Sequence, residues 1–254
     1  MRITIIGSGN VAWHLSHALQ QNGNEIIEVW SRSKKNAKLL SEKLNCKIIS
    51  NLNDLNNTDL VIISVKDDVI LEVADKIKDL KTPIVHTSGS VGIDIFYNRD
   101  QFGVFYPLQS FNKKINVNFN EIPICIKSNH ADLEKKLIDL GNLISNSVHV
   151  LNCHQRQQLH LAAVFSSNFT NHMMSISEKI LHTNNICFDL LRPLIRNTFK
   201  KIDNNHPKDV QTGPAIRKDY LIIKKHLNLL EESNDLQTIY SKISNHIIKN
   251  KLSE

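Results

Sequence analysis

The sequence predicts an α/β fold in which a doubly wound parallel sheet is followed by an all-helical C-terminal part. Strand-like and helix-like stretches alternate up to about residue 150, as in sheets whose strands are joined by crossover helices. The run Leu60–Val65 is apolar on both faces, as expected of a central strand covered from both sides. Beyond residue 152 only helical patterns remain. We therefore expect one domain over 1–152 and a helical domain over 153–254.

Each expected element follows from a short local pattern. Apolar, β-branched runs predict strands at 2–6, 25–30, 47–49, 60–65, 83–87, 102–106, 122–126 and 147–150. Amphipathic patterns predict helices between the early strands at 10–21, 34–44 and 69–79. Later helices are expected at 154–182, 187–203, 214–231 and 235–250, with breaks at Asn204–Pro207 and Thr212–Pro214.

Composition and charge argue against several classes of protein. The 254 residues are 41% hydrophobic and 22% charged, as in ordinary globular proteins. No apolar run is long enough for a membrane span, and the first residues do not read as a signal peptide. The net charge of +6 is scattered and aromatic residues make up only 6%, so we expect no nucleic-acid partner.

The cysteines and histidines indicate neither disulfides nor a metal site. Four well-separated cysteines without a CxxC pair suggest free thiols in a reducing cytoplasm. The spacing of His149, Cys153, His154 and His160 matches no strong zinc pattern, so we expect no bound metal.

The most informative motif is Gly7-Ser8-Gly9-Asn10-Val11-Ala12, which follows the first strand and opens the first helix. In that position it matches the fingerprint of a Rossmann dinucleotide site. Gly7 permits the tight turn, Gly9 lets the backbone approach a pyrophosphate, and Ala12 lets the helix pack on the strand. Free N–H groups at the helix N-terminus would bind the anion. The alternative is a tight turn that binds nothing.

The end of the second strand favours NADP over NAD. Its tip, Ser31-Arg32-Ser33, carries no acid, and Glu28 lies earlier, inside the strand. A carboxylate at the tip would accept hydrogen bonds from the ribose of NAD, whereas a guanidinium suits the 2′-phosphate of NADP. The alternative is a solvated basic loop.

Five segments in one order resemble those of a known family. They are Gly7–Ala12, Trp30–Ser33, Val85-His86-Thr87-Ser88-Gly89-Ser90, Tyr106-Pro107-Leu108-Gln109-Ser110-Phe111 and Gln211-Thr212-Gly213-Pro214-Ala215-Ile216-Arg217-Lys218-Asp219. Over nearly the whole chain they resemble proteins with a Rossmann-like and a DUF2520 domain, which are assigned as NADP oxidoreductases. That family is related to pyrroline-5-carboxylate reductase, ketopantoate reductase and 6-phosphogluconate dehydrogenase. The resemblance implies a 6-phosphogluconate dehydrogenase-like helical domain that forms a homodimer and closes the active-site cleft, but no particular substrate.

Three loops should reach the carboxyl edge of the sheet, where open α/β sheets bind ligands. The resemblance places the loop with Val65–Lys66 over the cofactor. The loop with Ser88 leaves room for a nicotinamide and offers a hydroxyl; alternatively, it is a polar turn with Gly89 in a left-handed conformation. Tyr106 and Gln109, after the sixth strand, are candidates to face a substrate.

The long helix after His154 places polar side chains in an apolar background. His160, Val164, Asn168 and His172 are spaced by four and fall on one stripe. We expect this helix to be buried and its polar residues to bond neighbouring helices or to line the site. In the ketopantoate and hydroxyacid reductases the resemblance implies a proton-donating lysine one turn before an asparagine. If Asn168 matches that asparagine, Val164 takes the lysine position, and His172 or His160 would be the general acid.

Arg217 is the candidate for an anionic substrate group. Pro214 is expected as the first residue of a helix, and a helix N-terminus beside Arg217 suits a carboxylate. The alternative is a structural pair with Asp219 that holds a dimer together.

These features predict a cytoplasmic, homodimeric oxidoreductase that transfers hydride from NADPH to a small polar C=O or C=N substrate between the domains. Asn168, His172 and Ser88 are expected to be catalytic, and Arg217, Gln109 and His160 to bind substrate. The expected cofactor contacts are Gly7, Ser8, Gly9, Asn10, Val11, Ala12, Ser31, Arg32, Ser33, Val65, Lys66 and Ser88. The alternatives are a non-catalytic NADP(H) sensor or scaffold, and an enzyme that also uses a deazaflavin.

Overall fold

A computed structural model describes residues 1–250 of the chain. It divides into two compact units, the first spanning Met1–Met174 and the second beginning at Ser175. The predicted domain limits, 1–152 and 153–254, lie where strand patterns give way to helical ones, which is before the division between the two compact units. These limits stay a prediction. Each unit is described by itself.

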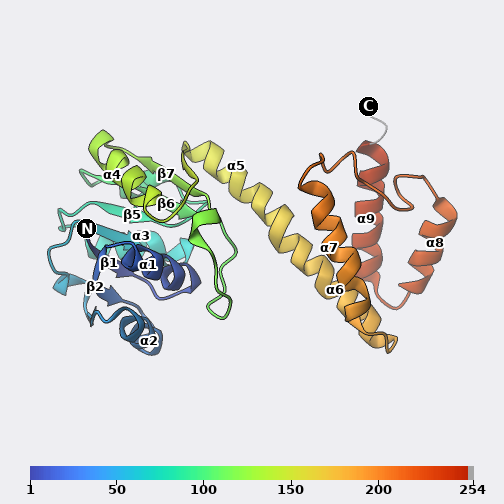
Figure 1. The fold of residues 1–254 in the computed structure, drawn as a ribbon, viewed down its shortest axis with the longest axis horizontal. Helices are drawn as coiled ribbons and strands as arrows, with labels where there is room; N and C mark the ends of the chain where they lie inside the picture. Colours follow the sequence, from blue (N-terminus) through green and yellow to red (C-terminus); the bar gives the residue numbers. More distant parts are fainter. Residues whose placement is uncertain (251–254) are drawn as a thin grey trace. The chain divides into compact units, whose positions relative to one another are not determined.

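The first unit is built on an eight-stranded sheet (Figure 1). Its strands are β1 (Arg2–Ile6), β2 (Glu25–Trp30), β3 (Lys47–Ile48), β4 (Leu60–Ile63), β5 (Ile84–His86), β6 (Phe102–Pro107), β7 (Ile124–Ser128) and β8 (Val148–Val150). Their order is β3-β2-β1-β4-β5-β6-β7-β8, and all neighbours are parallel except β6 and β7. The predicted doubly wound sheet is confirmed, with one antiparallel pair. That pair arises because the segment between β6 and β7 forms no crossover helix.

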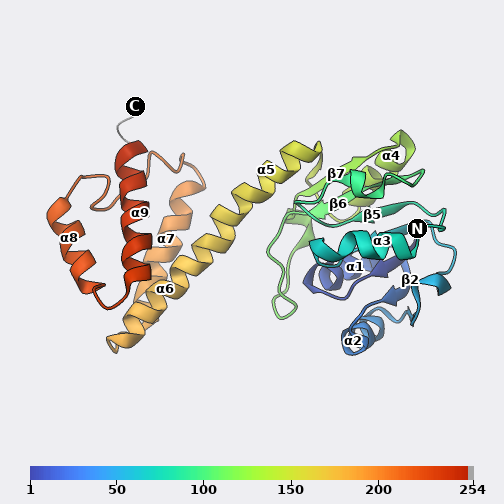
Figure 2. The same cartoon turned by 180° about the vertical axis from the view of Figure 1, so that it is seen from behind.

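Helices cover both faces of this sheet. The described helices of the first unit are α1 (Asn10–Gln21), α2 (Lys34–Leu44), α3 (Ile70–Lys76), α4 (Ala131–Asn142), α5 (Cys153–Ala163), the π-helical segment η5 (Val164–Phe169) and the start of α6 (Thr170–Thr183). In Figure 1, α1 and α4 lie over one face, and Figure 2 shows α3 over the other. The core accordingly forms two main clusters. Ile62 of β4 belongs to one and Ile63 to the other, as predicted for a central strand.

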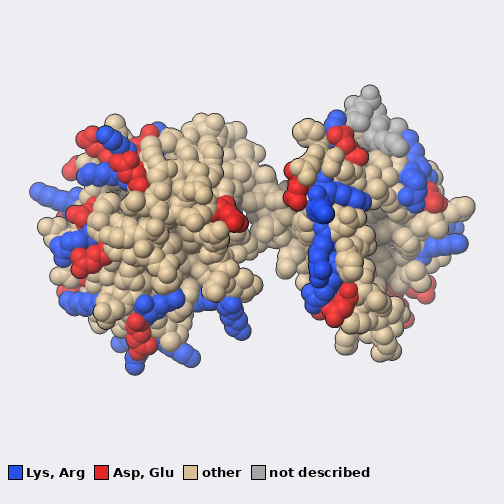
Figure 3. All heavy atoms as spheres, viewed as in Figure 1, with Lys and Arg blue, Asp and Glu red and all other residues tan. Residues whose placement is uncertain are grey.

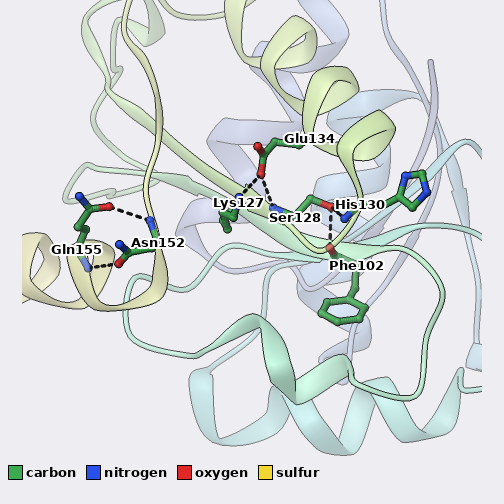
Figure 4. Close-up of polar contacts among 7 residues, drawn as sticks. All are labelled: Phe102, Lys127, Ser128, His130, Glu134, Asn152 and Gln155. Atoms are coloured by element: carbon green, nitrogen blue, oxygen red, sulfur yellow. Dashed lines mark hydrogen bonds and ion pairs between the residues drawn. The ribbon is translucent and has the colours of Figure 1, made fainter.

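Side-chain hydrogen bonds near the starts of α4 and α5 are drawn in Figure 4. At α5 the Asn152 side chain accepts from the Gln155 N–H at 2.9 Å, and the Gln155 side chain accepts from the Asn152 N–H at 3.0 Å. This reciprocal pair satisfies two N–H groups at the helix start. Glu134 of α4 accepts from Lys127 at 2.8 Å and from the Ser128 N–H at 3.1 Å, tying α4 to β7. Helix α4 was not among the predicted helices.

The second unit holds the rest of α6, then α7 (Arg192–Ile202), α8 (Tyr220–Leu229) and α9 (Asn234–Asn250). Helices α8 and α9 are joined by a 2.7 Å hydrogen bond between Nδ1 of His226 and the Tyr240 hydroxyl. The predicted helix over 214–231 is wrong at its start. Lys218 adopts a φ of 57°, which interrupts the helix, and Asp219 then caps α8 by accepting from the Ile222 N–H at 3.2 Å.

Charged side chains are interspersed over the first unit on the face drawn in Figure 3. On α7 the basic residues Arg192, Arg196 and Lys200 recur every four residues, which places them along one side of the helix. Across residues 1–250, no helix is both long enough and apolar enough to cross a bilayer.

Candidate cofactor and active site

The glycine turn has the geometry of an anion cradle. Gly7 has a φ of 121°, and a Cβ there would lie 2.0 Å from the Ser64 carbonyl oxygen, so only glycine fits. A Cβ on Gly9 would meet nothing within 4 Å, so open space lies over the turn. Among the described residues no side chain caps α1, and its first turn holds no acidic residue. Its N-terminal N–H groups therefore face room for a phosphate, and the turn fits a dinucleotide pyrophosphate.

The end of β2 lies beside this turn. The Ser8 hydroxyl donates to Ser31 Oγ at 2.7 Å, joining the glycine turn to the strand tip. Ser33 caps α2 by accepting from the Asn36 N–H, and Arg32 is exposed between these two serines. The buried Glu28 carboxylate accepts from the Thr4 hydroxyl and the Asn56 N–H, each at 3.0 Å. The Glu28 carboxylate is therefore not available at the surface, and the exposed charge at the tip of β2 is the Arg32 guanidinium.

The loops after β4 and β5 are connected at the same edge. The buried Thr87 hydroxyl donates to Ser64 Oγ at 3.2 Å. The carbonyl oxygen of the same Ser64 is the atom that leaves no room for a Cβ on Gly7. Val65 packs partly on the core and Lys66 is exposed. A Cβ on Gly7 would lie 3.3 Å from Val65 Cγ1, so Val65 is beside the glycine turn.

The Ser88 side chain stabilises the loop in which it lies. It is buried, and its hydroxyl oxygen accepts from the N–H groups of Ser90 and Val91, each at 3.0 Å. The alternative of a left-handed Gly89 is wrong, because Gly89 is not among the glycines with positive φ. A Cβ at Gly89 would instead approach His160 Nδ1 to 2.7 Å and Tyr106 Cζ to 2.8 Å. Glycine is needed here for close packing.

Tyr106 and His160 meet over that glycine. The Tyr106 hydroxyl lies 2.9 Å from His160 Nδ1 and hydrogen-bonds to it. Burial raises the pKa of Tyr106 to about 12, and the neighbouring Cys125 and Asp67 act in the same direction. The phenol therefore keeps its proton at neutral pH. The pair joins the carboxyl end of β6 to α5, and sequence reasoning named both residues without pairing them.

Two further side chains, Arg156 and His86, are buried in this region. The Arg156 guanidinium is wholly buried and donates to the Val91 carbonyl, while its Nε and Nη1 have no hydrogen-bond partner among the described residues. His86 accepts from the Ser88 N–H at 3.1 Å. Burial, and then the charge of Arg156, lower the pKa of His86 to about 3, so it is neutral at physiological pH. Sequence reasoning missed Arg156, whose only signal was a charged residue in the first turn of an apolar helix.

Comparisons with known proteins identify the family and the fold of the chain. Residues 2–86 match the family model "NADP oxidoreductase coenzyme F420-dependent", and residues 122–247 match "Domain of unknown function (DUF2520)". A structure from Bacteroides fragilis, titled as a putative NADP oxidoreductase, is 36% identical with a TM-score of 0.93, covering 98% of each chain. The chain therefore belongs to the family of NADP oxidoreductases with a DUF2520 domain.

More distant structures share the fold. An imine reductase from Myxococcus stipitatus in complex with NADP⁺ is 16% identical, with a TM-score of 0.66 over 98% of this chain and 92% of the other. A 1-pyrroline-5-carboxylate reductase from Streptococcus pyogenes is 17% identical, with a TM-score of 0.63 over 100% and 99%. No curated protein matches the chain. The DUF2520 protein described here thus has the fold of NAD(P)-dependent oxidoreductases.

Two further predicted residues of this family member, Asn168 and His172, lie apart from the Tyr106–His160 pair along the same helical stretch. Asn168 and His172 are exposed, and they follow His160 by roughly 12 and 18 Å along the helix axis. The expected burial of this helix is wrong for the single chain, since Leu161, Phe165 and Phe169 are 51%, 61% and 48% exposed. Their apolar surface has no cover among the described residues.

The two other predicted substrate contacts are exposed. The Gln109 side chain accepts from the Ser110 N–H at 2.7 Å. Arg217 lies in the turn before α8, so its predicted place beside a helix N-terminal Pro214 is wrong. Within residues 1–250, no ion pair joins Arg217 to Asp219, whose carboxylate is used as the cap of α8.

Proposed function

We propose that this chain is an NADP-dependent oxidoreductase that transfers hydride from NADPH to the carbon of a small polar C=O or C=N group. The observation that carries the proposal is the meeting of two features at one sheet edge. An open, uncapped anion cradle lies at Gly7–Ala12, and a hydrogen-bonded proton donor lies at Tyr106–His160. The titles of two distant structures with this fold name an imine reductase and a pyrroline carboxylate reductase, which supports a C=N substrate.

The residues that would hold the cofactor follow the carboxyl edge of the sheet. The N–H groups of Gly7, Ser8, Gly9, Asn10, Val11 and Ala12 would surround the pyrophosphate. Arg32, between Ser31 and Ser33, is placed for the 2′-phosphate, where a guanidinium can bind in a bidentate way. Val65, Lys66 and Ser88 would contact the nicotinamide half of the cofactor. NADPH, when bound, supplies the hydride.

The chain's own residues would supply the proton. Reduction of a carbonyl leaves an oxygen that must be protonated, and reduction of an imine starts from the protonated nitrogen. Tyr106 holds a proton at neutral pH and is hydrogen-bonded to a second titratable group, His160. When the His160 ring carries both of its protons, its Nδ1–H can return a proton to the phenolate that the transfer leaves, and the neutral imidazole remains. Asn168 and His172 remain the second candidates, and Gln109 and Arg217 remain candidates for substrate contacts.

The assembly proposal rests on exposed apolar surface. Leu161, Phe165 and Phe169 present large half-exposed side chains along consecutive turns of α5 and η5. Patches of this kind mark interaction surfaces, and we propose that a second copy of the chain covers them in a homodimer. The four cysteines are free thiols in the structure, which supports a cytoplasmic location.

The test is consumption of NADPH, followed by its absorbance, against a panel of cyclic imines, 2-ketoacids, aldehydes and an oxidised deazaflavin. Turnover of at least one C=O or C=N compound, with NADPH preferred over NADH, is expected. A second candidate function, a non-catalytic NADP(H) sensor, is favoured by Val164 if Asn168 matches the asparagine of the ketopantoate and hydroxyacid reductases, because Val164 then replaces their lysine. Tight NADPH binding without consumption of any member of the panel would support the sensor and contradict the reductase.

A further inference from the structure

The segment between β6 and β7 lies against the glycine turn, although about 100 residues separate them. Asn10 Nδ2 donates to the Phe111 carbonyl at 2.9 Å, and His14 Nε2 lies 2.9 Å from the Asn112 carbonyl. The rings of His14 and Phe111 stack with centroids 5.4 Å apart. Figure 1 shows this green segment passing the end of α1. Three separate contacts therefore fix the segment beside the N-terminus of α1.

Lys113 projects from this segment onto the turn itself. Its Nζ donates to the Ser8 carbonyl at 2.7 Å and lies 5.3 Å from the centroid of the Trp13 ring. Across residues 1–250, no carboxylate lies within 4.0 Å of this ammonium. Partial burial lowers the pKa of Lys113, because the charged form is less well solvated there. The fold thus holds a cation without a counter-ion at the backbone of the dinucleotide fingerprint.

We propose that Lys113 binds the pyrophosphate of the dinucleotide held by the glycine turn, an inference that rests on the proposed function. An ammonium has three donors, and the bond to Ser8 uses one of them. Because the carbonyl and N–H groups of one short turn are close neighbours, an anion on those N–H groups lies near Nζ. A pyrophosphate would supply the missing counter-charge. The glycine fingerprint contains no cation, so Lys113 would add one to it.

Two other roles for Lys113 predict different measurements. If Lys113 only anchors its segment to Ser8, its charge is unimportant for binding and its loss lowers stability. If it binds the 2′-phosphate, which the Ser8–Ser31 bond brings close, its loss weakens NADPH but not NADH. Pyrophosphate is common to both cofactors, so our proposal requires an equal effect on the two.

The experiment measures dissociation constants of NADPH and NADH by calorimetry for the full chain and three variants. Lys113→Ala is expected to weaken both cofactors about tenfold, as for the loss of a charged hydrogen bond. Lys113→Arg should restore binding, and Lys114→Ala, at the exposed neighbouring position, should bind like wild type. Thermal unfolding of each variant shows whether the fold is retained.

Several outcomes overturn the inference while leaving the proposed function intact. These are wild-type affinity in Lys113→Ala, an effect confined to NADPH, or an arginine variant as weak as the alanine variant. If the wild-type chain binds neither dinucleotide, the proposed function itself fails and the inference fails with it.

Discussion

The Tyr106 hydroxyl and Nδ1 of His160 lie 2.9 Å apart, directly over the backbone of Gly89. This relationship joins β6, α5 and the loop after β5 at one point of the sheet edge. In the proposed reductase this pair would deliver the proton.

Replacing Tyr106 by Phe removes this proton and keeps the ring. We expect kcat for reduction of the accepted substrate to fall by about 10²-fold or more, the usual scale of general-acid catalysis. The dissociation constant of NADPH should not change. His154→Gln, at an exposed position on α5, the helix that carries His160, is the control. Unchanged kcat in the Phe variant would remove Tyr106 from the mechanism and leave His172 as the candidate.

Gly89→Ala should disrupt the pair by overlap. The added Cβ would lie 2.7 Å from His160 Nδ1, so His160 and Tyr106 must move apart. We expect a loss of about 1–3 kcal/mol in the free energy of unfolding, measured in urea, together with lower activity. Gly92→Ala in the same loop is the control, because the nearest atom to its Cβ would be Cys153 Sγ at 3.6 Å, an ordinary van der Waals contact. Equal stability of the two variants would argue against this tight contact.

Arg32→Ala tests the choice of cofactor. Loss of a charged hydrogen bond to the 2′-phosphate should weaken NADPH binding about ten- to a hundredfold. NADH lacks that phosphate, so its dissociation constant should hardly change. The matched control is Lys35→Ala, a basic residue exposed in the first turn of α2. Equal wild-type affinity for the two cofactors would contradict the NADP assignment.

His86 should make the chain less stable in mild acid. In the folded chain its pKa is lowered to about 3, whereas the unfolded imidazole titrates at the ordinary 6.5. Between these values only the unfolded state takes up the proton, so the free energy of unfolding falls as the pH drops from 6.5. The contribution is up to about 1.4 kcal/mol per pH unit, and above pH 6.5 it vanishes.

The measurement compares urea unfolding at several pH values between wild type and His86→Asn, whose amide can accept from the Ser88 N–H. A flatter pH dependence is expected in the variant. His154→Asn, at an exposed site, should keep the wild-type slope. A variant slope identical to wild type would show that His86 is not the group responsible.

Most of the sheet could be predicted from local patterns because its strands differ clearly from their surroundings. Leu60–Ile63 is apolar at every position, and the glycines at 7 and 9 mark the first turn without ambiguity. Helix α4 was missed, although its buried Leu133, Leu137 and Leu140 repeat at helical spacing after the His130 cap. The antiparallel β7 could not be read from sequence, since strand direction depends on the path of the connecting segment.

The candidate site was only partly predictable. His160, Asn168 and His172 were correctly placed on one long helical stretch, but its Val164–Phe169 segment is π-helical, so a spacing of four does not keep them on one stripe. Periodicity also does not tell which turn of a helix meets the sheet. In the structure Arg156, Gln157 and His160 of α5 contact the loop after β5. The expected helix at Pro214 failed because the left-handed Lys218 and the Asp219 cap together move the helix start to Tyr220.

The sequence by itself determined the α/β class, the anion cradle at Gly7–Ala12 and the basic tip at Arg32, since each depends on residues that are neighbours along the chain. Only the tertiary structure decided that Tyr106 faces His160, that Arg156 is buried beside them and that Lys113 reaches Ser8. These contacts join residues 54 positions apart for Tyr106 and His160, 65 for Val91 and Arg156, and 105 for Ser8 and Lys113. No local pattern encodes such distances, because they are set by strand order and helix packing.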